Sequence, residues 1–195
     1  MFQSHSLEGT EMMTFRARIE GLSPLLMHRF SVEAEKAVEE QIKTKKADYG
    51  TPEEEAEQAA YRIDGPGSEL YLLGEAVYQS VVKAGVNFAV PGARGKTYKD
   101  AVKGMVMVVP DCIPLGTDKY EIDSRRVRIQ RGTCMRKRPR IDKWGAEFEV
   151  VILDEEALPP PTMLAILQRA GQTVGVLDYR PRFGRFQVTS WEQVP

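Results

Sequence analysis

Residues 70–82 read LYLLGEAVYQSVV, and this stretch decides how the chain is organised. The apolar run at 70–73 is typical of a short buried strand, which breaks at Gly74. Apolar residues then recur at helical spacing, namely Val77, Tyr78, Val81 and Val82. This spacing predicts an amphipathic helix over residues 75–86 that follows the strand directly.

Strands and a second helix are predicted on both sides of this step. Residues 14–19 alternate between apolar and basic side chains, as a half-buried strand does. Three prolines at 159–161 open an apolar-faced helix. Further strands are predicted at 105–109, 148–152 and 186–191. Apart from two insertions, the order approximates βαββαβ, so we predict a single α+β domain over residues 13–195 with a ferredoxin-like (RRM-like) antiparallel sheet.

Residues 31–64 form an acidic segment, with ten acidic against five basic residues. Two helices are predicted here, one over about 32–46 and one that begins at Thr51. Pro52 at the first helical position and Glu54 three residues after Thr51 form a capping box. The apolar face of the second helix is mostly alanine, which favours a solvated acidic helical insertion over a core element.

Residues 120–143 are predicted to form a basic β-hairpin that turns at Gly132 and Thr133. Residues 121–143 hold nine basic and three acidic residues. Arginines that alternate along a strand suit contact with successive phosphates. The candidate nucleic-acid-binding residues here are Arg125, Arg126, Arg128, Arg131, Arg136, Lys137, Arg138 and Arg140. The alternative is a solvated hairpin whose charge the acidic insertion balances, within the chain or in a neighbouring subunit.

Two further segments combine basic residues with glycine. Residues 179–186 read YRPRFGRF, in which Arg180, Arg182 and Arg185 alternate with aromatic residues that suit base stacking. The alternative is a turn into an edge strand that places the two phenylalanines in the core. Residues 91–99 form a basic loop whose candidate phosphate contacts are Arg94, Lys96 and Lys99, although a plain surface loop fits as well. This loop is not a P-loop, because Val90 stands where that motif needs glycine.

The sequence offers little catalytic chemistry. His28 is the only histidine within the predicted domain and could act as a general base, but no nucleophile pattern accompanies it. The two cysteines form neither a disulfide framework nor a zinc motif, so we expect no metal and no cofactor. No signal peptide or membrane span is recognisable, and we expect a cytoplasmic protein with no membrane partner.

Three segments together resemble the RAMP superfamily, the RNA-binding subunits of CRISPR effector complexes. They are IEGLSPL at 19–25, the 70–82 step, and the glycine-containing stretch that runs from 174 to FGRF at 183–186. Leu73 and Glu75 stand where the family usually has proline and serine. The resemblance implies a ferredoxin-like core that grips single-stranded RNA, often as repeated subunits. A stand-alone or phage-encoded relative that binds single-stranded DNA fits equally well, because stacking and phosphate contacts do not need a 2′-hydroxyl.

We therefore predict a non-catalytic protein that coats single-stranded RNA or DNA as a homo-oligomer. One alternative is a RAMP-type endoribonuclease with His28 as the base. Another is an assembly protein without nucleic acid, whose basic hairpin docks on the acidic insertion of its neighbour.

Overall fold

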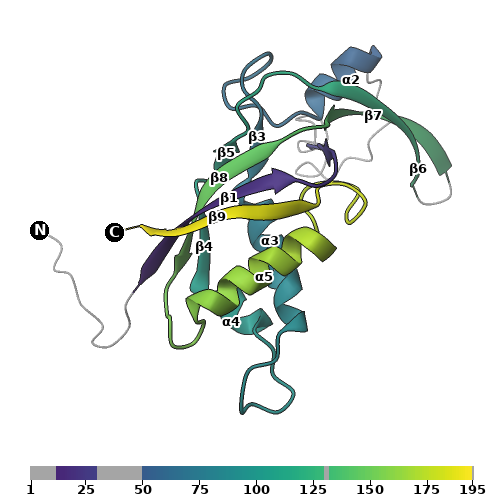
Figure 1. The fold of residues 1–195 in the computed structure, drawn as a ribbon. Helices are drawn as coiled ribbons and strands as arrows, with labels where there is room; N and C mark the ends of the chain where they lie inside the picture. The colour runs from purple at the N-terminus through teal and green to yellow at the C-terminus, as the bar shows by residue number, and fades with distance from the viewer. Residues whose placement is uncertain (1–11, 30–49, 130–131, 195) are drawn as a thin grey trace, which may run out of the picture.

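A computed structural model of the chain describes residues 12–29, 50–129 and 132–194 (Figure 1). Its main sheet has four antiparallel strands in the order β4-β8-β1-β9. These strands are β1 (Met13–Gly21), β4 (Val106–Val109), β8 (Gly145–Ile152) and β9 (Phe186–Val194). The first strand, β1, pairs with the last strand, β9, so the sheet joins the two ends of the described chain.

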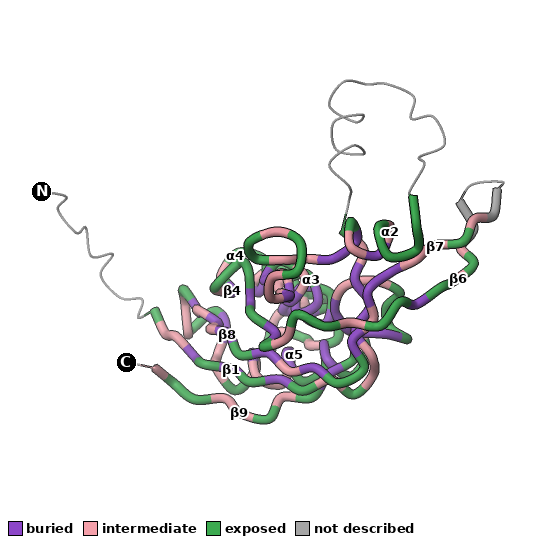
Figure 2. The backbone as a smooth tube through the Cα atoms, turned by 90° about the horizontal axis from the view of Figure 1, so that it is seen from above, coloured by how far each residue is buried: buried purple, intermediate pink, exposed green. Residues whose placement is uncertain are grey.

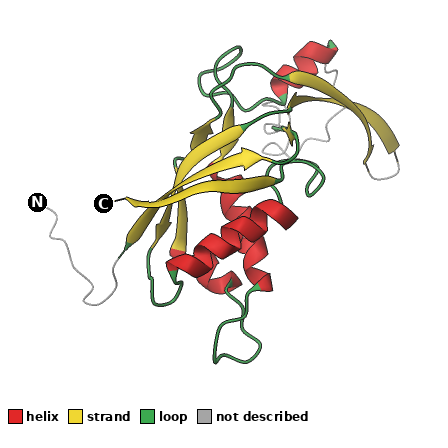
Figure 3. Cartoon of the chain, in the orientation of Figure 1, coloured by secondary structure: helices red, strands yellow, loops and turns green. Residues whose placement is uncertain are grey.

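Helices cover one face of this sheet (Figure 3). They are α3 (Gly74–Ala84), η1 (Gly85–Asn87), α4 (Lys99–Met105) and α5 (Pro160–Thr173). The side chains of β1 alternate, with Phe15, Ala17 and Ile19 buried and the arginines between them exposed (Figure 2). The strand and helix predictions for 14–19 and 75–86 are confirmed, and the fold is α+β. Within the described ranges, no helix is long and apolar enough to cross a membrane.

A second sheet projects from this body and contains the predicted hairpin (Figure 1). Its strands are β2 (Leu25–Leu26), β7 (Gly132–Ile141) and β6 (Glu121–Ile129), with β6 at one edge. The hairpin lies between β4 and β8 in the sequence, after the small strand β5 (Cys112–Pro114), which pairs with β3 (Tyr71–Leu73). The hairpin is therefore an extension of the connection between two neighbouring strands of the main sheet.

The capping box of the second acidic helix is confirmed, but its alanine face is buried, which the prediction of a solvated insertion did not include. Helix α2 (Pro52–Gln58) begins at Thr51, whose hydroxyl accepts from the backbone N–H of Glu54. However, α2 packs on β7, and Ala56, Ala59 and Ala60 are buried. The alanine methyl groups permit this close approach, because larger side chains would hold the helix off the hairpin. The other predicted acidic helix, at 32–46, lies outside the described residues.

Candidate nucleic-acid interface

The loop before β9 packs against the hairpin through an arginine and two aromatic rings. The Cζ atom of Arg125 lies 4.5 Å from the centre of the Phe183 ring and 5.6 Å from that of Tyr179. The Asp123 carboxylate accepts two hydrogen bonds from the Arg125 guanidinium, at 2.6 and 2.9 Å, and these raise the pKa of Arg125. Arg125 is therefore held in place by its own strand, and it positions the rings of the loop.

The backbone of this loop, residues 176–185, is closed at its base. The Val176 N–H donates to the carbonyl of Gly184 at 2.9 Å, and the Gly184 N–H donates to the carbonyl of Pro24 at 2.9 Å. Gly184 has a φ of +71°, and a Cβ there would clash with the backbone of Val176, so only glycine fits. Leu177 and Tyr179 also have positive φ, of 57° and 59°, a conformation that is uncommon and strained for residues other than glycine.

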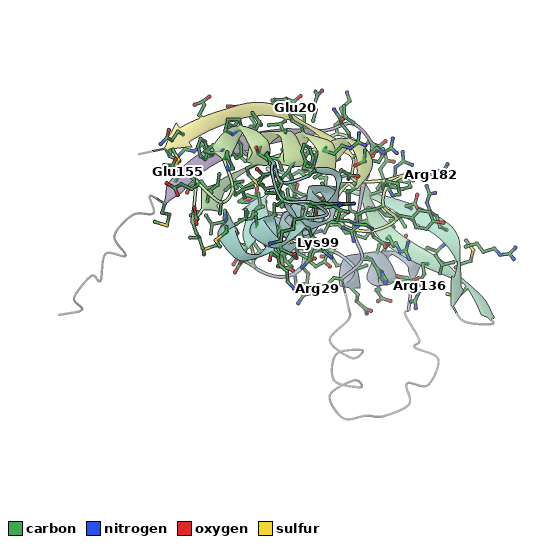
Figure 4. All side chains as sticks on the ribbon, turned by 90° about the horizontal axis from the view of Figure 1, so that it is seen from below. Glu20, Arg29, Lys99, Arg136, Glu155 and Arg182 are labelled. Atoms are coloured by element: carbon green, nitrogen blue, oxygen red, sulfur yellow. The ribbon has the colours of Figure 1, made fainter. Side chains whose placement is uncertain are left out.

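The loop itself carries exposed cationic side chains. Arg180, Arg182 and Arg185 are exposed, and so is 42% of Tyr179. Figure 4 shows Arg182 and the hairpin residue Arg136 at the same end of the molecule. The loop and the hairpin, which the sequence presented as separate candidates, thus form one surface. We call residues 121–129, 132–141 and 177–185 the hairpin–loop surface.

Half of the candidate residues on the hairpin have acidic partners within the chain, and one of these partners, Glu55, belongs to the acidic insertion, as the alternative interpretation of the hairpin expected. Arg138 lies 2.8 Å from the Asp178 carboxylate, Arg136 lies 3.6 Å from that of Glu55, and Arg140 lies 2.6 Å from that of Asp142. Together with the Arg125–Asp123 pair, these ion pairs neutralise four of the eight candidate residues on the hairpin.

The remaining hairpin candidates differ in position. Arg126 is exposed on the face opposite to Arg125, and Lys137 on that face donates to the Ser124 hydroxyl. Within the described ranges, Arg126, Arg180 and Arg182 form no ion pair. The side chains of Arg128 and Arg131 lie outside the part of the chain that is described.

The basic loop at 91–99 does not join this surface. Arg94, Lys96 and Lys99 are exposed where the chain passes from η1 to α4, at the end of the molecule away from the hairpin (Figure 1). The structure therefore separates these three candidates from the hairpin arginines, because α3 leads the chain away from the hairpin before the loop begins.

The uncovered face of the main sheet does not offer the aromatic platform by which RRM domains stack bases. The Arg16 side chain lies 3.5 Å from the Glu149 carboxylate and 3.9 Å from that of Glu147 on this face. Among the described residues, the side chains of β1, β4, β8 and β9 that point to this face include no aromatic ring. The exposed ring of Tyr179 and the exposed side chains of Arg180 and Arg182 lie instead on the hairpin–loop surface.

His28 lies beneath the hairpin–loop surface and is partly buried. Burial lowers the pKa of His28, and the nearby Arg138 lowers it further, so the imidazole is neutral at neutral pH. Its Nδ1 atom has no hydrogen-bond partner among the described residues. His28, Asp178 and Arg180 line a pocket of about 250 Å³ at the start of α3.

Sequence reasoning did not predict that these residues form a pocket. It is also lined by Tyr61, Glu75, Gln79 and three apolar residues, which come from the acidic segment, the 70–82 step and the 174–186 stretch that the sequence analysis treated separately. In the described part of the chain, no group of three or more His, Cys, Asp or Glu residues could hold a metal ion.

No protein-family model and no curated protein sequence matches the chain.

Proposed function

We propose that the protein binds single-stranded RNA or DNA through the hairpin–loop surface and does not catalyse a reaction on it. The observation that carries this proposal is the packing of Arg125 on Phe183 and Tyr179. This packing holds an exposed ring and two exposed arginines at one place, and single-stranded nucleic acid is bound by this combination of stacking and phosphate contact. Because β6 lies at the edge of its sheet, a bound single-stranded nucleic acid reaches Arg126 by passing around that edge.

We further propose a ferredoxin-like core of the RAMP type. In support, the strand order β4-β8-β1-β9, with α3 and α5 as the crossovers, is the order of a βαββαβ unit. The three segments that carry the resemblance also meet in space. Leu22 N–H donates to the carbonyl of Arg185 at 2.7 Å, and Leu73 and Leu177 line the same pocket. Short motifs that are far apart in the sequence and converge on one site support a common role.

An endoribonuclease is the second candidate, favoured by the placement of His28 beside Arg180 in the pocket. A neutral imidazole could take the proton of an RNA 2′-hydroxyl, whose oxygen would attack the adjacent phosphorus and displace the 5′-oxygen of the next nucleotide, leaving a 2′,3′-cyclic phosphate. The leaving oxygen would take a proton from the imidazolium or from water, and an arginine would stabilise the developing charge. Incubation of labelled single-stranded RNA with the protein separates the two candidates. The main proposal expects the RNA to remain intact, whereas cleavage that is lost in His28→Ala supports the ribonuclease.

The described acidic residues give less support to an assembly protein without nucleic acid. Glu55 and Glu57 contact Arg136 and Arg62 of the same chain, so these two carboxylates of the insertion are already paired. Homo-oligomerisation along a long strand stays a prediction. Titration of short and long oligonucleotides, with light scattering, tests it through cooperativity that appears only on the long strands.

Fluorescence anisotropy tests the main proposal with labelled single-stranded RNA, single-stranded DNA and the matching duplexes. We expect at least one single strand to bind more tightly than its duplex, because bases in a duplex are not free to stack on Tyr179. The variant Arg180→Gln/Arg182→Gln should bind that strand about tenfold more weakly. Absence of binding to all of these probes would overturn the proposal.

A further inference from the structure

The pocket beside His28 has walls that suit a planar ligand. Leu73, Ala76 and Leu177 supply apolar surface, and the volume of about 250 Å³ is sufficient for one aromatic heterocycle. Leu177 and Asp178 belong to the loop that presents Tyr179 and Arg182 to solvent, so the pocket adjoins the hairpin–loop surface. A ligand in the pocket can therefore be part of a strand that lies on this surface.

The polar groups of the pocket are rich in hydrogen-bond acceptors. The Gln79 side-chain amide donates to Glu75 Oε1 at 2.6 Å, which fixes both groups on one turn of α3. The carbonyl oxygen of Gln79 and the second carboxylate oxygen of Glu75 remain as exposed acceptors, whereas the Asp178 carboxylate is already paired with Arg138. Arg180 is the one cationic donor among the lining residues.

We propose that this pocket takes one unpaired guanine base of the bound strand, an inference that rests on the proposed function. Guanine presents adjacent N1–H and N2–H donors that fit a carboxylate, while its O6 and N7 acceptors suit an arginine. Adenine, cytosine and uracil lack the paired donors, so none of them can donate to two adjacent acceptors of Glu75 and Gln79 at once. Guanine therefore fits the lining better than the other three bases.

Anisotropy titrations with twelve-nucleotide oligouridine and oligothymidine strands test this inference. Each strand carries guanine, hypoxanthine, adenine or the parent pyrimidine at one central position. We expect the guanine strand to bind about tenfold more tightly than the parent strand. Hypoxanthine lacks the N2 amine, and we expect its strand to bind with intermediate affinity.

The variant Glu75→Gln should abolish the preference for guanine and retain the affinity for the parent strand, whereas Glu155→Gln, at the far end of the molecule, should change neither (Figure 4). Equal binding of all strands, or a guanine preference that survives Glu75→Gln, would overturn the pocket assignment and leave the proposed function standing. Failure of every strand to bind would instead overturn the proposed function, and the pocket assignment with it.

Discussion

The guanidinium of Arg125 lies over the face of the Phe183 ring, with its Cζ atom 4.5 Å from the ring centre. This contact joins an edge strand of the inserted hairpin to the loop that precedes the last strand of the main sheet. It requires no partner molecule, so the exposed residues of the loop are held in place before any ligand binds. Preorganisation of this kind reduces the entropy lost on binding.

The first prediction concerns this contact. The free energy of unfolding in urea is measured for wild type, Arg125→Met, Phe183→Leu and the double variant. The loss of stability in the double variant should be smaller than the sum of the two single losses by about 0.5–2 kcal/mol. The reason is that either substitution alone already removes the interaction between the cation and the ring. Strictly additive effects would show that the contact does not hold the loop on the hairpin.

A second prediction concerns the pair that anchors α2. Arg62 donates to both carboxylate oxygens of Glu57, at 2.5 and 2.9 Å, and the Tyr120 hydroxyl donates to the same group at 2.8 Å. These contacts lower the pKa of Glu57, and burial together with the bond to Glu57 raises the pKa of Tyr120 to about 12. Glu57→Gln should lower the free energy of unfolding by about 1–3 kcal/mol, because it leaves the buried Arg62 side chain without its anion.

The control for this prediction is Glu53→Gln in the exposed first turn of the same helix. It should change the free energy of unfolding by less than about 0.5 kcal/mol. Equal effects of the two substitutions would contradict an anchoring role for Glu57.

The sequence predicted the helices and strands better than it predicted how they pack against one another. The strand at 14–19 and the helix after Gly74 follow from side-chain periodicity, which is a local property. The packing of α2 on β7 does not follow from it, because three small alanines give a weak apolar signal although they allow close approach. The local charge of the hairpin was misleading for a related reason, since Glu55 and Asp178 neutralise two of its arginines from distant positions in the chain.

The candidate site was predicted only in part. The hairpin and the YRPRFGRF loop are visible in the sequence as basic segments, but their contact through Arg125 is a tertiary feature. The positive φ of Leu177 and Tyr179 could not be predicted, because neither residue type favours that conformation. These two residues flank Asp178, so the meeting of this stretch with the 70–82 step in one pocket could not be predicted either.

The third prediction is a pH dependence of stability. His28 is surrounded by Arg138, Asp178, Arg136 and Glu55, and burial holds its pKa below the ordinary value of 6.5. As the pH falls below 6.5, the unfolded chain gains a proton before the folded chain does, so stability is complete above this pH and declines below it. Urea unfolding between pH 7.5 and pH 5 should show this decline in wild type and a smaller one in His28→Gln. Parallel curves for the two proteins would contradict a neutral, buried His28.

The fourth prediction concerns base stacking on the exposed ring of the loop. Tyr179→Leu should weaken the binding of single strands about tenfold, because stacking of one base on an aromatic ring contributes about 1–3 kcal/mol. Tyr179→Phe keeps the ring and should bind as wild type does. Loss of affinity in Tyr179→Phe would show that the hydroxyl matters instead of the ring.

The salt dependence of binding tests the central claim most directly. For single strands, the slope of log Kobs against log salt concentration is about −0.7 for each phosphate neutralised. The triple variant Arg126→Gln/Arg180→Gln/Arg182→Gln should therefore have a slope less negative than that of wild type by about 2. The matched variant Arg94→Gln/Lys96→Gln/Lys99→Gln removes the same charge at the other end of the molecule and should keep the wild-type slope. Equal slopes for the two triple variants would contradict nucleic-acid binding at the hairpin–loop surface.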